Sequence, residues 1–289
     1  MAITLDDIKT LRARTGAGMA DCKKALEEAD GNMDDAIDIL RKKGAATAAK
    51  RADKAADEGA ISTAISGDHT AAAIVEINCE TDFVARNEEF STFAAAVAEL
   101  ILRTNPASEA ELMAAEIDGT SVEKHLNDLL AKFSERIEIR RYDRIESEGG
   151  FLADYVHSGS RLAVLVELEG VSDEQKGEAL ARDVAMQVAA MNPAHVRRED
   201  VTDSTLEKER EIYREQLASE NKPAEILEKI IGGRIEKYYE QNVLLEQSFV
   251  KDSSKSVQEV LREEGGDGVT VRQFIRYNLG EAVDEPVSR

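Results

Sequence analysis

The sequence predicts an α+β protein in which a helical N-terminal bundle precedes a two-part core with antiparallel sheets and an inserted antiparallel helical hairpin. Three observations lead to this prediction. Apolar residues recur at helical spacing over residues 1–44, strand and helix patterns alternate over residues 59–200, and the pattern over residues 203–247 is polar and helical. The 289 residues suffice for about two domains, and 42% of them are hydrophobic, which suffices for a core.

Residues 1–54 are predicted to form three short helices and a basic linker. Thr4, with Asp7 three residues later, is a typical helix N-cap, and Gly16 is expected to end this first helix. Two further apolar faces at helical spacing follow, and Gly44 is expected to end the third helix. Helices of this length would make a compact bundle with a modest core.

The stretch over residues 41–54 is locally basic. Its cations are Arg41, Lys42, Lys43, Lys50, Arg51 and Lys54. Charge runs are usually solvated faces, so one interpretation is a solvated helical linker. The other interpretation is a contact with a partner or with ribosomal RNA.

The first part of the core is predicted from two strand patterns joined by a turn. Strands Ala60–Ser66 and Ala71–Asn78 flank Gly67 and Asp68, which is typical of a β-hairpin. The elements expected after it are a helix from near Asn87, a helix over Val122–Phe133 and a strand over Ile137–Tyr142.

The second part of the core repeats this order. A hairpin over residues 150–168 mirrors the one over residues 59–78, and a helix over about residues 173–191 follows it. A later helix is expected over Val257–Leu261. A strand over Val269–Leu279 would then return to the second sheet.

The segment over residues 203–247 is predicted to be an antiparallel helical hairpin. It is expected to turn near Ser219–Pro223, with Gly232 and Gly233 as a further interruption. It has few apolar positions per turn, which is typical of a protruding arm and not of a core element. The arm would be an insertion between a helix and the last strand of the second part.

The composition argues against several functional classes. Lys and Arg number 37 against 58 Asp and Glu, a net charge of −21, so the chain as a whole is a poor ligand for a phosphate backbone. There is no Trp and only 4% of residues are aromatic, whereas deep small-molecule pockets usually have aromatic walls. No glycine-rich phosphate loop and no metal-ligand spacing occurs. The sequence therefore predicts no cofactor, no metal and no directly bound nucleotide.

Cysteine usage and the first residues indicate the compartment. The two cysteines, Cys22 and Cys79, are far apart, and neither a secretion signal nor a membrane-length apolar run is found. These features predict reduced thiols, no membrane contact and a cytoplasmic location. Cys22 lies on an apolar helix face and is expected to be core.

Thr81, Asp82, Phe83 and Val84 form the most informative stretch of the chain. They follow a predicted strand and are expected in a polar loop, where an exposed phenyl ring would leave apolar surface in water. Two interpretations compete. The ring tucks under its own loop while Asp82 caps the following helix, or the ring fills a pocket on another protein.

Three segments together resemble the elongation factor Ts family, over about residues 4–280. The first segment runs over Leu11–Met19 and Asp21–Leu26, the second over Glu76–Ala85, and the third over Leu244–Val250 with Lys255–Val257. The first two are long and specific, so their joint occurrence in this order by chance is improbable.

The resemblance implies a domain organisation. It implies a ubiquitin-associated-like (UBA-like) N-terminal domain with its basic linker and a two-part core that carries an inserted coiled coil. The implied boundaries are 1–54 for the N-terminal domain, 55–140 for the first core subdomain, 141–202 with 248–280 for the second, 203–247 for the coiled coil and 281–289 for a short tail. A helical module that the family carries at the C-terminus is expected to be missing here.

The resemblance also implies a function. A member of this family is a guanine nucleotide exchange factor in translation elongation, which promotes GDP release from elongation factor Tu and makes no covalent bond. Phe83 would insert between helices of the partner's G domain near its Mg²⁺ site, and Asp82 would hydrogen-bond in the same contact. The other implied contact residues are Thr81, Val84, Arg12, Met19, Lys23, His157 and Ile137. A second contact through the core or the coiled coil, and a 2:2 assembly, are further implications.

Three alternatives stay open. Met19 fits the core of the bundle as well as an interface. A UBA-type adaptor would use the N-terminal bundle but would not need the Thr81–Val84 stretch, and a binding partner that holds elongation factor Tu without exchange activity is the related alternative. An enzyme with Cys79 as nucleophile would need a nearby base and a lowered pKa, and no sequence pattern supplies them.

Overall fold

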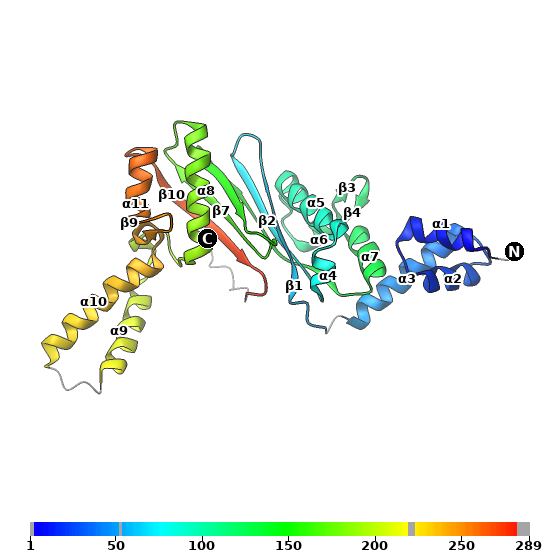
Figure 1. Cartoon of the computed structure of the whole chain (residues 1–289), viewed down its shortest axis with the longest axis horizontal. Coiled ribbons are helices and arrows are strands. Elements are labelled where there is room, and N and C mark those ends of the chain that lie inside the picture. Colours follow the sequence, from blue (N-terminus) through cyan, green and yellow to red (C-terminus); the bar gives the residue numbers. More distant parts are fainter. Residues whose placement is uncertain (1–2, 52–53, 219–222, 282–289) are drawn as a thin grey trace.

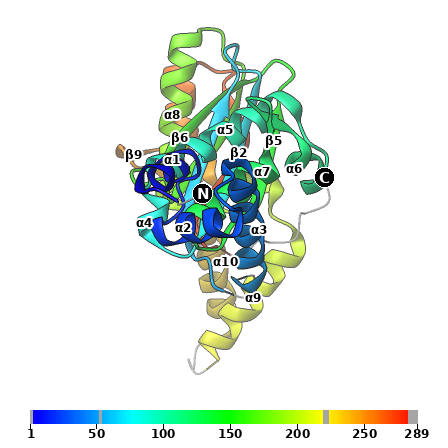
Figure 2. The ribbon, with the colours of Figure 1, turned by 90° about the vertical axis from the view of Figure 1, so that its right-hand side faces the viewer.

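The computed structural model describes residues 3–51, 54–218 and 223–281 and shows an elongated molecule (Figure 1). The N-terminal helices lie at one end and the helical arm projects near the other, with two sheets between them. Figure 2, viewed from the N-terminal end, shows the arm extending away from the layers of the core. Within the described ranges, no helix is long and apolar enough to cross a membrane.

The N-terminal bundle consists of α1 (Leu5–Thr15), α2 (Met19–Glu28) and α3 (Met33–Arg51). The predicted cap is confirmed, because Thr4 and Asp7 form a reciprocal capping box, and Gly16 ends α1 in the left-handed conformation. The fully buried side chains of Leu11, Cys22 and Leu26 belong to its small core.

The prediction that Gly44 ends the third helix is wrong, because α3 continues to Arg51. Gly44 lies against α7 (Val122–Phe133), and a Cβ atom placed on it would come within 2.6 Å of the Cβ of Ala131. The glycine therefore permits close packing between the bundle and the core, at about 1 kcal/mol of helix propensity relative to alanine.

The first sheet is antiparallel with the order β1-β2-β5. It contains β1 (Glu58–Ile65), β2 (Ala71–Cys79) and β5 (Ile137–Glu146), and α5 (Glu88–Thr104) covers one face. The predicted hairpin and the helix over Val122–Phe133 are confirmed. The segments before α7 are α4 (Asp82–Ala85), α6 (Glu109–Ala114), β3 (Glu116–Ile117) and β4 (Thr120–Ser121). The predicted subdomain boundary at 140/141 falls inside β5.

The second sheet repeats this arrangement. Strands β6 (Phe151–Val156), β7 (Leu162–Glu169) and β10 (Thr270–Asn278) form an antiparallel sheet with β7 at the centre, and α8 (Glu174–Met191) covers it. Each half of the core thus follows the same chain order. A hairpin comes first, then a helix, and then a strand that returns to pair with the second strand of the hairpin. The mixed α+β class with antiparallel sheets is confirmed; the UBA-like and coiled-coil descriptions stay predictions.

The two sheets pack face to face, with α5 and α8 on the outer sides (Figure 1). All nine residues of β2 are buried, which agrees with a sequence that is apolar on both faces apart from Glu76 and Asn78. Val75 and Ile77 face the core under α5, whereas Ile74 packs between the sheets. Strand β7 divides in the same way, since Val166 and Leu165 belong to different clusters.

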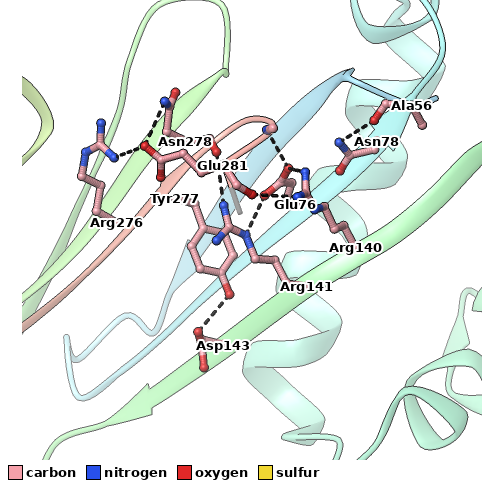
Figure 3. Close-up of polar contacts among 11 residues, drawn as sticks. Ala56, Glu76, Asn78, Arg140, Arg141, Asp143, Arg276, Tyr277, Asn278 and Glu281 are labelled. Carbon is pink, nitrogen blue, oxygen red and sulfur yellow. Dashed lines mark hydrogen bonds and ion pairs between the residues drawn. The ribbon is translucent and has the colours of Figure 1, made fainter. Parts of the chain in front are cut away.

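A buried ion cluster fastens the end of β10 to the first sheet (Figure 3). The side chain of Glu76 is fully buried and accepts hydrogen bonds from Arg141 Nε at 2.6 Å and from the backbone N of Gly280 at 3.2 Å. Arg140 lies 3.4 Å from the same carboxylate and donates to the carbonyl oxygen of Glu281 at 2.7 Å. The negative charge of Glu76 is therefore compensated by the two arginines inside the interface, as a buried charge requires.

The arm consists of α9 (Asp203–Leu217) and α10 (Ala224–Asn242). The predicted interruption at Gly232 and Gly233 is wrong, because α10 runs through both. Most of the predicted turn, residues 219–222, lies outside the described residues, as does the predicted tail after residue 281.

The arm also ends earlier than predicted. Val243 and Leu244 are fully buried in the second half of the molecule, so the residues after Asn242 are core. The remaining segments are the 3-10 helices η1 (Arg198–Asp200) and η2 (Leu244–Glu246), β8 (Ser248–Phe249), β9 (Asp252–Ser256), α11 (Val257–Val260) and the π-helical η3 (Leu261–Gly265). The helix expected over Val257–Leu261 and the returning strand are confirmed.

Candidate functional site

Phe83 lies on the surface of a single helical turn, α4, directly after β2. Its side chain is 84% exposed, whereas its neighbour Val84 is 5% exposed and packs into the core under α5. The predicted polar loop is therefore a helical turn that is anchored by Val84 and presents Phe83 outward. The interpretation in which the ring tucks under its own segment is wrong.

Asp82 does not cap the following helix. Asn87 occupies that position, with its side-chain oxygen 3.0 Å from the backbone N of Glu89. Asp82 instead pairs with Arg86 one turn further on, at 3.1 Å. Its carboxylate is about half exposed and lies beside Phe83 in the sequence, so it is accessible to a partner that reaches the ring.

Thr81, which precedes Asp82 and Phe83, is held by Glu135 just before the neighbouring strand β5. The backbone N and the hydroxyl of Thr81 donate to the two carboxylate oxygens of Glu135 at 3.0 and 2.7 Å. Glu135 follows α7, whose last turn ends at Ser134 in the left-handed conformation. The start of α4 is thus fixed to the junction between α7 and β5.

Glu80 ties the same junction to the N-terminal bundle. Its carboxylate accepts from the Arg51 guanidinium, at 2.5 and 2.6 Å, and from the backbone N of Arg136 at 2.6 Å. Burial opposes ionisation, but these donors outweigh it and lower the pKa of Glu80. The end of α3, where Arg51 lies, is therefore attached one residue before Thr81.

His157 lies at the same end of β1 as α4. It follows β6 and is exposed, and its Nδ1 is 2.8 Å from the hydroxyl oxygen of Tyr155. Glu58 at the start of β1 is paired with Cys79 in the hairpin register and forms an ion pair with Arg161 of the β6–β7 turn. The turn that carries His157 and the helical turn that carries Phe83 therefore flank one strand end.

The other predicted contact residues differ in position. Arg12 and Lys23 are exposed on α1 and α2, and Met19 is 37% exposed, so Met19 lies on the surface and not in the bundle core. Lys23 is one turn after Met19 and pairs loosely with Glu27 at 3.7 Å. Ile137 was expected at the interface, but it is only 3% exposed and packs in the core under α5. Its side chain therefore does not reach the surface.

Cys79 lacks the character of a nucleophile, and described cations of the basic segment pair within this chain. Burial, followed by the nearby carboxylate of Glu135, raises the pKa of Cys79 to about 12, which is opposite to what a nucleophile needs. Arg41 lies 3.8 Å from Asp128, and Lys43 forms an ion pair with Asp21. The segment up to Arg51 is thus helical and packs on the core, and a contact of its cations with a partner or with ribosomal RNA stays a prediction. In the part of the chain that the structure describes, no cluster of three or more potential metal ligands occurs.

Two bracing residues were not predicted. Glu80 and Glu135 brace the segment that carries Phe83. Glu80 lies inside the Glu76–Ala85 segment but was not singled out, and Glu135 stands in no recognisable pattern. Their partners are distant along the chain: 54 residues separate Thr81 from Glu135. Only the pairing of β2 with β5 brings them together, and sequence periodicity does not give that register.

Comparisons with known proteins agree with the resemblance seen in the sequence. The protein family described as Elongation factor TS matches residues 80–281. The protein named Elongation factor Ts from Prosthecochloris aestuarii is 47% identical, over 96% of this chain and 99% of its own length. Those of Clostridium perfringens and Thioalkalivibrio sulfidiphilus are 45% and 46% identical, over 98% and 99% of this chain and 95% and 94% of their own lengths.

Proposed function

This chain belongs to the elongation factor Ts family of translation elongation factors, and from that premise we propose that it releases GDP from elongation factor Tu by inserting Phe83 near the Mg²⁺ site of the partner's G domain. The exposure of Phe83 on a braced helical turn carries the proposal. An exposed ring on a well-packed element is ready to enter a pocket without a prior rearrangement of this chain.

Burial of the ring supplies the driving force. Removing a phenyl side chain from water is worth about 1.5–3 kcal/mol. Because Phe83 is 84% exposed in the free protein, nearly all of this free energy is available on binding. Val84 contributes none of it directly, since its side chain is already buried, and it acts as the anchor of the turn.

Exchange follows from differential binding. If the wedge fits only the nucleotide-free form of elongation factor Tu, it weakens GDP binding by the same factor by which GDP weakens binding of this protein. Mg²⁺ neutralises the nucleotide's phosphates, so a ring that displaces the Mg²⁺-binding segment destabilises bound GDP. The protein needs no bond-making group, in keeping with the high pKa of Cys79.

Further contacts would orient the wedge. Asp82, whose carboxylate is about half exposed, would hydrogen-bond in the same contact as Phe83, and His157 flanks the same end of β1. Arg12, Met19 and Lys23 are exposed at the far end of the molecule and would grip the G domain separately. Two-point attachment of this kind would keep the factor bound while the nucleotide leaves. We place this activity in the cytoplasm, and a 2:2 assembly with the partner stays a prediction.

Release of a fluorescent GDP analogue from elongation factor Tu tests the proposal. The wild-type protein is expected to accelerate release strongly, and Phe83→Ala is expected to lose most of the acceleration while remaining folded. Val250→Ala is the matched control, because Val250 is another exposed apolar side chain, 50% exposed, in the β8–β9 turn.

Each alternative gives a different result. Acceleration that persists in Phe83→Ala would keep exchange but move its cause to the N-terminal bundle or His157. Tight binding without acceleration by the wild type would indicate a holder of elongation factor Tu. Absence of binding would favour a UBA-type adaptor with another partner.

A further inference from the structure

The structure assigns to Glu135 the role of a positioning residue that holds the Phe83 turn in its productive orientation through Thr81. This inference rests on the proposed function, since it concerns how the wedge is aimed. It is carried by the geometry of α4, by the two hydrogen bonds between Thr81 and Glu135, and by the surroundings of Glu135.

Helix α4 cannot hold itself in place. It comprises only Asp82–Ala85, and a single helical turn is unstable without tertiary support. Its N-cap residue, Thr81, makes no side-chain capping bond, which is unusual for a threonine in that position. The hydroxyl points away from the helix and donates to Glu135 instead. The usual local stabilisation has therefore been replaced by a bond to another part of the fold.

Glu135 is suited to this task. Its two carboxylate oxygens accept separately from the backbone N and the hydroxyl of Thr81, so both the position and the rotation of that residue are defined. Within the described ranges, Glu135 forms no ion pair, although it is partly buried. A partly buried carboxylate without a cation is costly, and in the part of the chain that the structure describes the two hydrogen bonds from Thr81 offset this cost.

Two of the anchors of this segment act on the helical turn itself and define the direction of the Phe83 ring. Val84 fixes the C-terminal part of the turn to the core, and Thr81 fixes its N-terminal part to Glu135. Without the second anchor, α4 would pivot about Val84, and the ring would sample orientations that do not enter the partner's pocket. The encounter with elongation factor Tu would persist through the N-terminal bundle, but productive insertion would become rarer.

The test measures GDP release as a function of the concentration of this protein, which separates the maximal rate from the half-saturating concentration. Glu135→Ala is expected to lower the maximal rate about tenfold, with a smaller change in the half-saturating concentration. Thr81→Val, which removes only the hydroxyl donor, should show part of the loss. Thr81→Ser keeps both donors and should retain more of the maximal rate than Thr81→Val.

A double variant distinguishes positioning from a separate contribution. If Glu135 acts through the ring, Glu135→Ala in a Phe83→Ala background should cause little further loss. A full additional loss there would overturn the inference. A normal maximal rate in Glu135→Ala, combined with a slow rate in Phe83→Ala, would also overturn the inference. This result would leave the proposed function intact. A normal rate in Phe83→Ala would instead overturn the wedge itself, and the role of Glu135 with it.

Controls separate positioning from stability. The hydroxyl of Ser108 accepts from the backbone N of Glu111 and caps α6. Ser108→Ala removes this bond and should lower the free energy of unfolding about as much as Glu135→Ala does, without changing GDP release. If Glu135→Ala does not fold, Thr81→Val and Thr81→Ser carry the comparison. Equal maximal rates for those two variants and the wild type would then contradict the inference.

Discussion

The guanidinium of Arg141 lies 4.0 Å above the ring of Tyr277, so a residue of β5 in the first sheet stacks on a residue of β10 in the second. The hydroxyl of Tyr277 donates to Asp143 at 2.9 Å, and burial raises the pKa of this tyrosine. Because Arg141 also binds the buried carboxylate of Glu76, one side chain links both sheets electrostatically and by stacking.

We expect Arg141→Ala to lower the free energy of unfolding by about 3–5 kcal/mol, because it leaves the Glu76 carboxylate buried with only Arg140 nearby. Arg210→Ala, which breaks an exposed pair with Glu207 on the arm, should cost less than about 1 kcal/mol. Urea denaturation followed by circular dichroism measures both. Equal losses in the two variants would show that the cluster is not a stabilising link.

Neighbouring substitutions in α4 should have unequal effects on the free energy of unfolding. Val84→Ala is expected to reduce the free energy of unfolding by about 2 kcal/mol, because it leaves a cavity in the core under α5. Phe83→Ala should change it by no more than about 0.5 kcal/mol, because the ring is exposed. Thermal unfolding of the two variants checks the contrast. A large destabilisation in Phe83→Ala would mean that the ring packs against this chain in solution.

The bond between Glu80 and Arg51 should weaken in acid. The pKa of Glu80 is lowered from its ordinary value of 4.5, so the folded state favours the ionised form, and this stabilisation is present above about pH 4.5 and lost as the pH falls through the lowered pKa. Glu80→Gln lacks the charge at every pH. The difference in melting temperature between wild type and Glu80→Gln should therefore shrink below pH 4.5, and a difference that stays constant to pH 3 would contradict the assignment.

Cys79 should be unreactive in the folded protein. Its pKa of about 12 leaves very little thiolate at pH 8, and its thiol donates to the carbonyl oxygen of Thr81 at 3.2 Å. Burial also raises the pKa of Cys22. Iodoacetamide labelling with peptide mass spectrometry should modify neither cysteine until urea unfolds the chain. Rapid labelling of Cys79 under native conditions would reopen the question of its reactivity.

The arm should be removable only in part. Replacing residues 211–234 by a short Gly-Ser loop should leave a folded protein, because Arg198 keeps its contacts with Glu236, at 2.7 Å, and with the Tyr239 ring. Removing residues 203–247 should prevent folding, since Val243 and Leu244 are fully buried. Circular dichroism and size-exclusion chromatography distinguish the two products. A folded product of the longer deletion would show that these residues are dispensable to the core.

Local signals explain which elements could be predicted from the sequence. The helix over Val122–Phe133 was predicted with its observed bounds, because Ser121 caps it and a strong apolar stripe runs along it. The repeated hairpins were predicted because their turns and alternating strands are local features as well. The exposed position of Phe83 was anticipated as one of two interpretations, since an aromatic residue in a polar segment is unusual.

Long-range contacts explain what could not be predicted. Gly44 has the sequence signature of a helix end, and only its contact with Ala131 shows why a glycine stands inside α3. Ile137 has the character of a strand residue near the site, but the packing of α5 and α7 decides that it points inward. The brace from Glu135 to Thr81 depends on the pairing of β2 with β5, which no local pattern specifies.

The two copies of the hairpin–helix–strand unit meet as the halves of a symmetric dimer do. Ile61 faces Glu76 in the first hairpin as Leu152 faces Glu167 in the second, and by the same register Thr63 is the counterpart of Asp154, with which it forms a hydrogen bond. The contact is therefore isologous within a single chain.

Covalent linkage removes a constraint that a true homodimer would impose. In a homodimer every substitution appears twice, whereas here each half can change alone. The buried carboxylate of the first half, Glu76, is paired with Arg140 and Arg141. That of the second half, Glu167, accepts from the amide of Gln273 at 2.7 Å and from the hydroxyl of Ser147, with one arginine, Arg272, 3.9 Å away. The same freedom allowed one half to receive the N-terminal bundle on α7 and the other to extend into the arm, so a pseudo-symmetric core carries two unlike attachments.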